Sequence, residues 1–171
     1  MNVKFLNPFL QAAIEVLKAE TDLNLERGEL CLEKSSYQTD DVTTIISLVG
    51  NVEGNVFYSM STQTAVGLAS QMLGERLDEF DNLAQSGIAE LGNVITGRAS
   101  VLLSEAGFEA TISPPTLLIG KGSTISTLDF PRLVVPFHIS FGTLMIHLAL
   151  REGNAKKIKT AQIPIPNRPS F

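Results

Sequence analysis

The segment Ser86–Ser100, SGIAELGNVITGRAS, constrains the fold of this chain more than any other. Its apolar residues recur at helical spacing, which predicts a helix. The segment nevertheless contains Gly87, Gly92 and Gly97. Each glycine inside a helix costs about 1 kcal/mol relative to alanine. Several glycines in one helix therefore require an explanation, either in the packing of its buried face or in the contacts of its exposed face.

The predicted helix has two different faces. Positions i, i+4, i+7 and i+11 lie on one side of a helix, and this side presents Ser86, Glu90, Asn93 and Gly97. The other side presents apolar residues that can enter a core, namely Ile88, Leu91, Ile95 and Leu102. Gly92 and Gly97 flank the polar pair and remove bulk, which would let another surface come close. A solvated helix face with glycines needed for packing is the alternative.

Helical and strand patterns alternate along the rest of the chain. Helices are predicted over residues 3–20, from a cap at Thr62 to Gly74, and from the acidic segment 77–82 to about Ala106. Strands are predicted at about 25–34, 42–50, 56–61, 109–119, 130–139 and 143–151, with a turn at 50–55. The predicted order along the chain is one helix, three strands, two helices and three strands. This order indicates one α+β domain over residues 1–151. A tail with three prolines follows at 152–171.

Composition excludes several classes of protein. Hydrophobic residues make up 44% and charged residues 18% of the chain, as in globular proteins rather than disordered ones. The net charge is −5, and the densest basic cluster, Lys156, Lys157 and Lys159, lies in the tail. We therefore expect no nucleic acid as partner. No stretch reaches the roughly 18 apolar residues of a membrane span, so we expect no membrane contact.

The compartment is predicted from cysteine usage and from the first residues of the chain. Cys31 is the only cysteine, which excludes an intrachain disulfide and favours a reducing compartment. Gln11 and Glu15 interrupt the apolar stretch of the N-terminal segment, so it does not read as a signal peptide. We expect a cytoplasmic protein.

Other candidate sites carry weaker signals. His138 and His147 flank the SFGT turn and could be cross-strand neighbours, but no third zinc ligand is evident, so we expect no metal site. Cys31 lies in a strand pattern, where a packing role is favoured over a nucleophilic one. Lys121 lies in IGKGST, which lacks P-loop spacing and reads as a turn between strands.

The spacing Ser86-x-x-x-Glu90-x-x-Asn93, followed by Pro114 and Pro115, resembles the signature of the CheC/CheX family of chemotaxis phosphatases. The resemblance extends over about residues 1–151 and includes FLNPFLQAAIEVL, GNVEGNVFYSMSTQTAVGLASQML and LVVPFHISFGTLMIHLAL. With a single motif, the chain is more similar to CheX than to the two-site CheC. The family fold implies a mainly antiparallel sheet with helices packed on it.

The resemblance implies an activity, which is dephosphorylation of the aspartyl phosphate on CheY-like receiver domains. Asn93 would position a water for in-line attack, and Glu90 would pair with a receiver lysine. Ser86 and Gly97 would belong to the docking surface. The receiver would supply Mg²⁺, so the chain needs no cofactor of its own. A module that binds a receiver or an adaptor without turnover is the alternative, and a purely structural, dimer-forming subunit is a third possibility.

The resemblance also implies a homodimer, because CheX proteins pair through sheet edges. The segment 137–150 contains no lysine and no proline, and an unprotected apolar edge of this kind invites pairing. The tail segment AQIPIP could instead cover that edge and leave a monomer. Lys4 and Asn7 in the first helix weakly echo Glu90 and Asn93, but the charge is reversed, so we assign this helix no activity.

Overall fold

The computed structural model describes residues 3–33, 36–128 and 130–153. The predicted tail falls almost entirely outside these residues. The helices are α1 (Val3–Thr21), α2 (Thr62–Leu73) and α3 (Asn82–Glu105). The strands are β1 (Glu26–Arg27), β2 (Cys31–Glu33), β3 (Ser36–Gln38), β4 (Val42–Gly50), β5 (Val52–Met60), β6 (Ala110–Ile112), β7 (Thr116–Ile119), β8 (Thr124–Ser126), β9 (Arg132–Ile139) and β10 (Gly142–Glu152). None of the helices in this part of the chain has an apolar stretch long enough to cross a membrane.

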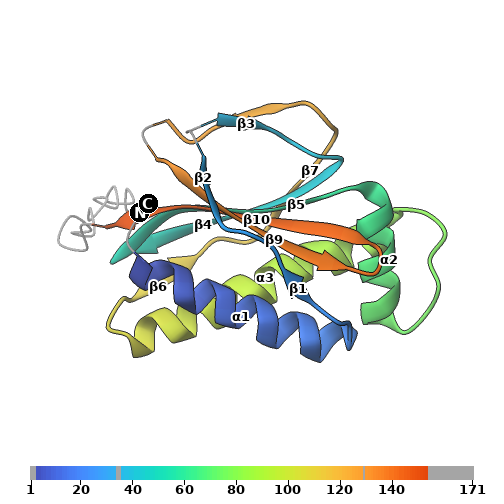
Figure 1. Cartoon of the computed structure of the whole chain (residues 1–171), viewed down its shortest axis with the longest axis horizontal. Helices are drawn as coiled ribbons and strands as arrows, with labels where there is room; N and C mark the ends of the chain where they lie inside the picture. Colours follow the sequence, from blue (N-terminus) through green and yellow to red (C-terminus); the bar gives the residue numbers. More distant parts are fainter. Residues whose placement is uncertain (1–2, 34–35, 129, 154–171) are drawn as a thin grey trace, which may run out of the picture.

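The strands form one large antiparallel sheet and one small one. The large sheet has eight strands in the order β1-β9-β10-β5-β4-β6, with β2 also pairing with β9 and β7 with β4. The small sheet contains only β3 and β8. Helices α1 and α3 lie side by side against one face of the large sheet, and β3 lies beyond the opposite face (Figure 1). The α+β class and the antiparallel sheet expected from the sequence are confirmed.

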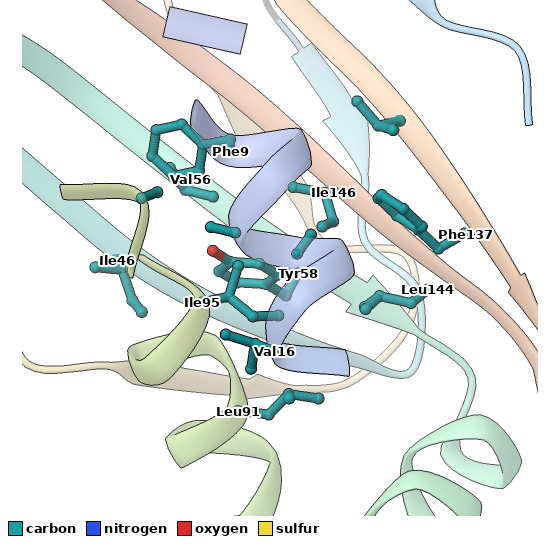
Figure 2. Packing of buried hydrophobic residues seen from close by; sticks show 14 of the residues in the cluster. Phe9, Val16, Ile46, Val56, Tyr58, Leu91, Ile95, Phe137, Leu144 and Ile146 are labelled. Carbon is teal, nitrogen blue, oxygen red and sulfur yellow. The ribbon is translucent and has the colours of Figure 1, made fainter. Parts of the chain in front are cut away.

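The core fills the layer between the helices and the large sheet. Alternate residues of β4 point into this layer, and Val42, Ile46 and Leu48 are buried there. Figure 2 shows side chains from both layers meeting, among them Phe9, Val16, Tyr58, Leu91, Ile95 and Ile146. Full burial of each large apolar side chain contributes about 1.5–3 kcal/mol, so this layer is the main source of stability.

Several strand boundaries differ from the sequence prediction, for reasons of backbone bonding. The predicted strand 25–34 is divided into β1 and β2, because the register against β9 shifts by one residue between the pairs Arg27–Phe137 and Cys31–Val134. The predicted strand 109–119 is divided into β6 and β7 at Pro114 and Pro115, which lack the backbone donor of a ladder. The short strand β3 was not predicted at all.

The predicted turn at 50–55 is present but shorter, because β4 continues to Gly50 and the antiparallel β5 begins at Val52. Gly54 lies inside β5 with φ +136°, and a Cβ there would lie 2.0 Å from the Ala149 carbonyl oxygen of β10. Only glycine fits this close approach of two strands. A glycine that resembles a turn signal in the sequence is therefore a strand residue.

Helix boundaries agree better with the prediction. The cap of α2 is Ser61 rather than Thr62, because Ser61 has extended backbone angles and its hydroxyl accepts from the Thr64 amide at 3.1 Å. Gly74 ends this helix with φ +68°, as predicted. Pro8 lies inside α1, beyond its first turn.

The hairpin of β9 and β10 does not form an open sheet edge, so that expectation is wrong. Strand β10 lies between β5 and β9, and the outer side of β9 is covered by β1 and β2. The segment 137–150 tolerates the lack of lysine and proline because the strands of this hairpin have neighbours on both sides.

Two adjacent threonines of β4 differ in hydrogen bonding although both are fully buried. The Thr43 hydroxyl lies 2.6 Å from the Ser59 hydroxyl on the face away from α3. The Thr44 hydroxyl faces the helices, and the described residues provide no hydrogen-bond partner for it.

Replacing each threonine by valine keeps the shape and removes one hydroxyl. We expect Thr43→Val to lower the free energy of unfolding by about 1 kcal/mol, because Ser59 loses its partner. Thr44→Val should leave this free energy unchanged or raise it, because an unsatisfied hydroxyl is removed. Urea unfolding of both variants measures the difference, and an equal loss in both would contradict the assignment.

Candidate functional site

The helix that carries the predicted site is α3, which is capped at both ends. The Asp81 carboxylate accepts from the Ala84 amide at 2.9 Å and caps the start of the helix. The helix ends at Ala106, and Gly107 follows with φ +87°. The inner face is buried against the sheet and the other helices through Ala84, Ile88, Leu91, Ile95, Ala99 and Leu103. Leu102, which was predicted to be in the core, is only half-buried.

The outer face of α3 brings the predicted site residues together. Ser86 and Glu90 are exposed, and Asn93 and Gly97 are half-buried. The Asn93 side-chain amide donates to a Glu90 carboxylate oxygen at 3.4 Å, a long and weak hydrogen bond. The Ser86 hydroxyl donates to the Asn82 carbonyl at 2.9 Å, so it can offer a partner only its acceptor lone pairs.

Gly92 and Gly97 of α3 have different roles, and the role of Gly92 differs from the prediction. Gly92 is buried, and a Cβ at this position would lie 3.0 Å from Thr44 Cγ2 and 3.1 Å from Tyr58 Cδ2. Gly92 therefore allows the helix to pack closely on the sheet; it does not clear space for a partner. At Gly97 the nearest atom to an added Cβ is Ile112 Cδ1, 3.9 Å away, so this part of the helix is open.

Two apolar side chains on the same helix were missed by the sequence analysis. Leu83 is 45% exposed and Val101 is 49% exposed. Leu83 precedes Ser86 by one helical turn, and Val101 follows Gly97 by one turn, so the two residues lie at the ends of the polar stripe. Leu83 and Val101 continue the helical spacing of the polar stripe, and this spacing could have identified them from the sequence. We call the surface of Leu83, Ser86, Glu90, Asn93, Gly97 and Val101 the outer face.

An ion pair connects α3 to α1 beside this face. Arg98 Nε lies 2.6 Å from a Glu15 carboxylate oxygen, and Gln11 donates to the other carboxylate oxygen at 2.8 Å. The hydrogen bonds from Arg98 and Gln11 lower the pKa of Glu15. Glu15 is therefore charged near neutral pH, and its pairing with Arg98 orients one helix relative to the other.

The two histidines are not cross-strand neighbours, so that expectation is wrong. In the register of β9 and β10, His138 lies opposite Thr143 and His147 opposite Val134. Burial and the nearby Arg132 lower the pKa of His147 to about 3, so its ring is neutral. Among the described residues, no group of three or more histidine, cysteine, aspartate or glutamate side chains could hold a metal ion.

The remaining candidates do not form a site either. Cys31 is exposed on β2, contrary to the predicted packing role, because β2 borders the large sheet. Lys121 lies in the turn between β7 and β8, as predicted, 3.9 Å from Asp40.

The hollows in the surface do not reach the polar centre of the outer face, although one of them borders Val101 at its end. Three of about 400–490 Å³ are lined by residues that include Tyr37 and His147, Leu23 and His138, and Val49 and Ser104. Glu90 and Asn93 line none of these three. Small-molecule substrates are usually enclosed in a pocket, and Glu90 and Asn93 lie on an exposed helix face instead. This position favours a substrate group that is presented by another macromolecule.

Comparisons with known proteins agree with this geometry. A family profile described as chemotaxis phosphatase CheX matches residues 42–138 of the chain. The CheY-P phosphatase CheX of Thermotoga maritima is 26% identical over 155 residues, which cover 90% of this chain and 99% of that protein. A CheC-like superfamily protein from Shewanella sp. PV-4 is 31% identical with a TM-score of 0.79, covering 88% of this chain and 99% of that chain.

A structure that includes a partner protein is also similar. A chain of the CheX–CheY–BeF3–Mg²⁺ complex from Borrelia burgdorferi is 31% identical with a TM-score of 0.77, covering 86% of this chain and 98% of its own length. The profile match extends over more than half of the sequence, and two solved relatives exceed 30% identity over most of it. This chain therefore belongs to the CheX family of chemotaxis phosphatases.

Proposed function

We propose that this chain hydrolyses the aspartyl phosphate of a CheY-like receiver domain. Asn93 positions the attacking water, and Glu90 pairs with a lysine of the receiver. The observation that carries the proposal is the Glu90–Asn93 pair on the outer face of a CheX-family fold, where both side chains can reach another protein. The proposed place of action is the cytoplasm, where a single unpaired cysteine stays reduced.

The chemistry needs little more than a positioned amide. Phosphoryl transfer passes through a loose transition state, so catalysis depends on alignment of the water and on charge stabilisation. A side-chain amide can accept a hydrogen bond from the water and donate one to a neighbour. The Borrelia burgdorferi complex contains CheY, BeF3 and Mg²⁺. In our proposal Mg²⁺ belongs to the receiver, and this chain contributes no cofactor.

The rest of the outer face supports docking. Ser86 is exposed, and at Gly97 the helix backbone is open to close approach. Leu83 and Val101 present apolar area at both ends of the polar stripe, and removal of such area from water favours association. Polar residues between two apolar contacts also fix the register of a partner, because a shifted partner would leave Glu90 unpaired.

Asn93→Ala should lower the rate of receiver dephosphorylation by about 100-fold or more, because the water loses its positioning group. Folding should be unchanged, because the half-buried amide makes only one long hydrogen bond to the described residues. Asn7→Ala in α1, which removes another exposed amide, is the matched control and should keep full activity.

Phosphate release from phosphorylated receiver domains measures both variants. If Asn93→Ala retains the wild-type rate, Asn93 has no catalytic role. If the wild-type chain binds receivers and releases no phosphate above the receiver's own rate, the non-catalytic binding module is the better description.

Glu90→Lys should weaken receiver binding more than Glu90→Ala, because a lysine would face the lysine of the receiver. A like-charge contact at an interface costs several kcal/mol, whereas alanine removes only the attraction. Titration calorimetry with a receiver held in its phosphorylated form compares the two variants. Equal affinities for both would rule out the docking role of Glu90.

We also propose that the chain forms a homodimer through sheet edges. The support is the border strand β2, where Cys31 and Leu32 are exposed, Leu32 to 65%, and Leu30 directly before the strand is exposed as well. Unpaired backbone groups and apolar side chains at an edge invite pairing with a second strand. The tail that could compete for an edge lies outside the described residues.

Light scattering tests the homodimer at micromolar concentration. We expect a mass of twice 18.5 kDa that does not change on dilution. A mass near 18.5 kDa would show a monomer.

A further inference from the structure

A chain of two hydrogen bonds connects the sheet to the backbone of the proposed site. The Tyr58 hydroxyl of β5 lies 2.7 Å from the Thr96 hydroxyl of α3. The Thr96 hydroxyl donates to the Gly92 carbonyl at 2.8 Å. Because the single hydroxyl hydrogen of Thr96 is used in this bond, the Tyr58 hydroxyl must be the donor to Thr96.

The carbonyl at the end of this chain belongs to the peptide unit that joins Gly92 to Asn93. A sheet residue is thus linked through one threonine to the peptide group that carries Asn93. Tyr58 is 2% exposed and Thr96 is fully buried, so water does not compete for these bonds. Hydrogen bonds in such a dry layer are stronger than at the surface and hold a narrow geometry. Burial also raises the pKa of Tyr58, which keeps its hydroxyl protonated as a donor.

The absent side chain of Gly92 completes the arrangement. A Cβ at this position would come within 3.0 Å of Thr44 and 3.1 Å of Tyr58, so the helix already touches both strands at this residue. The hydrogen-bond chain pulls the helix toward the sheet, and the direct contact stops its approach. The hydrogen bonds and the direct contact together fix the distance between the Gly92–Asn93 peptide and the sheet.

The Asn93 side chain has little positioning of its own. Its contact with Glu90 is 3.4 Å long, and both residues belong to the same helix. The position of the amide relative to the rest of the protein therefore depends on the backbone of residues 92–96, which is anchored on its buried side. A reaction that depends on alignment is sensitive to small displacements of the positioning group.

We propose that Tyr58 and Thr96 are positioning residues for the reaction, which fix the backbone that carries Asn93 and so set kcat. The inference rests on the proposed role of Asn93 in receiver dephosphorylation. Neither residue reaches the outer face, because both are buried in the layer behind it. Their removal should affect alignment of the water and leave docking of the receiver unchanged.

The test compares four variants in receiver dephosphorylation. Tyr58→Phe and Thr96→Val break the hydrogen-bond chain and keep the side-chain volume nearly constant. We expect each to lower kcat roughly three- to tenfold, less than the ~100-fold loss that a 1 Å misplacement can cause, with KM within about twofold of wild type. Thr96→Ser keeps the hydroxyl and should retain most of kcat. Thr44→Val is the matched control, because it removes a neighbouring buried hydroxyl for which the described residues offer no hydrogen-bond partner.

A second readout does not depend on activity. The ¹⁵N relaxation of the Asn93 backbone and side-chain amides should show increased motion in Tyr58→Phe and Thr96→Val, but not in Thr96→Ser or Thr44→Val. Circular dichroism confirms that each variant is folded at the assay temperature. Unchanged kcat in folded Tyr58→Phe and Thr96→Val, or a loss that appears in KM, would overturn the proposal.

The two readouts separate this inference from the proposed function. If wild type and Asn93→Ala dephosphorylate receivers equally, the proposed role of Asn93 fails. The positioning role for the reaction then fails with it, and the relaxation data decide only whether Tyr58 and Thr96 hold the Asn93 backbone: increased motion in Tyr58→Phe and Thr96→Val would show that they do, and unchanged motion that they do not. If Asn93→Ala is inactive and both buried-hydroxyl variants are fully active, only the positioning role fails.

Discussion

The contact between Gly92 of α3 and the strands β4 and β5 determines how closely the two layers of this fold approach each other. Thr44 and Tyr58 already lie where a side chain of residue 92 would be. A larger residue would force these side chains or the helix to shift, and so disturb the layer that Leu91 and Ile95 fill. Closely packed cores tolerate such expansion poorly. The helical penalty of this glycine is therefore offset by the packing of the whole layer.

Close packing behind α3 leaves its outer face free for chemistry. The proposed catalytic side chains need no pocket, because the reacting group and its Mg²⁺ would arrive on the receiver. An amide on a convex surface can enter the site of another protein, whereas an amide at the bottom of a hollow cannot. The rigidity that the reaction requires must then come from the buried side of the helix, which is where Tyr58 and Thr96 lie.

The opposite face of the large sheet is closed in a different way. Arg132 is fully buried there; it donates to Glu33 at 2.8 Å and to His147 at 3.0 Å, and it lies 4.1 Å from the Tyr37 ring. A buried charge of this kind is tolerated because it is paired and hydrogen-bonded. This polar cluster attaches β3, which lies beyond the sheet face opposite α1 and α3 (Figure 1), to the sheet. Apolar packing dominates the layer between the sheet and these two helices.

Local patterns in the sequence were enough to predict the three helices, the α+β class and the polar stripe from Ser86 to Gly97, because helical periodicity and capping depend on residues within a few positions of each other. Contacts between distant segments decided the rest. Gly54 resembles a turn residue until β10 is placed against it, and Gly92 resembles an open docking position until Tyr58 is placed behind it. The apolar hairpin resembles a free edge until β5, β1 and β2 are paired beside it. The sequence alone thus determined which residues face outward together on α3. Only the tertiary structure decided which contacts hold these residues in place. The reason is that a close contact between two strands, or between a strand and a helix, leaves no local pattern in either segment.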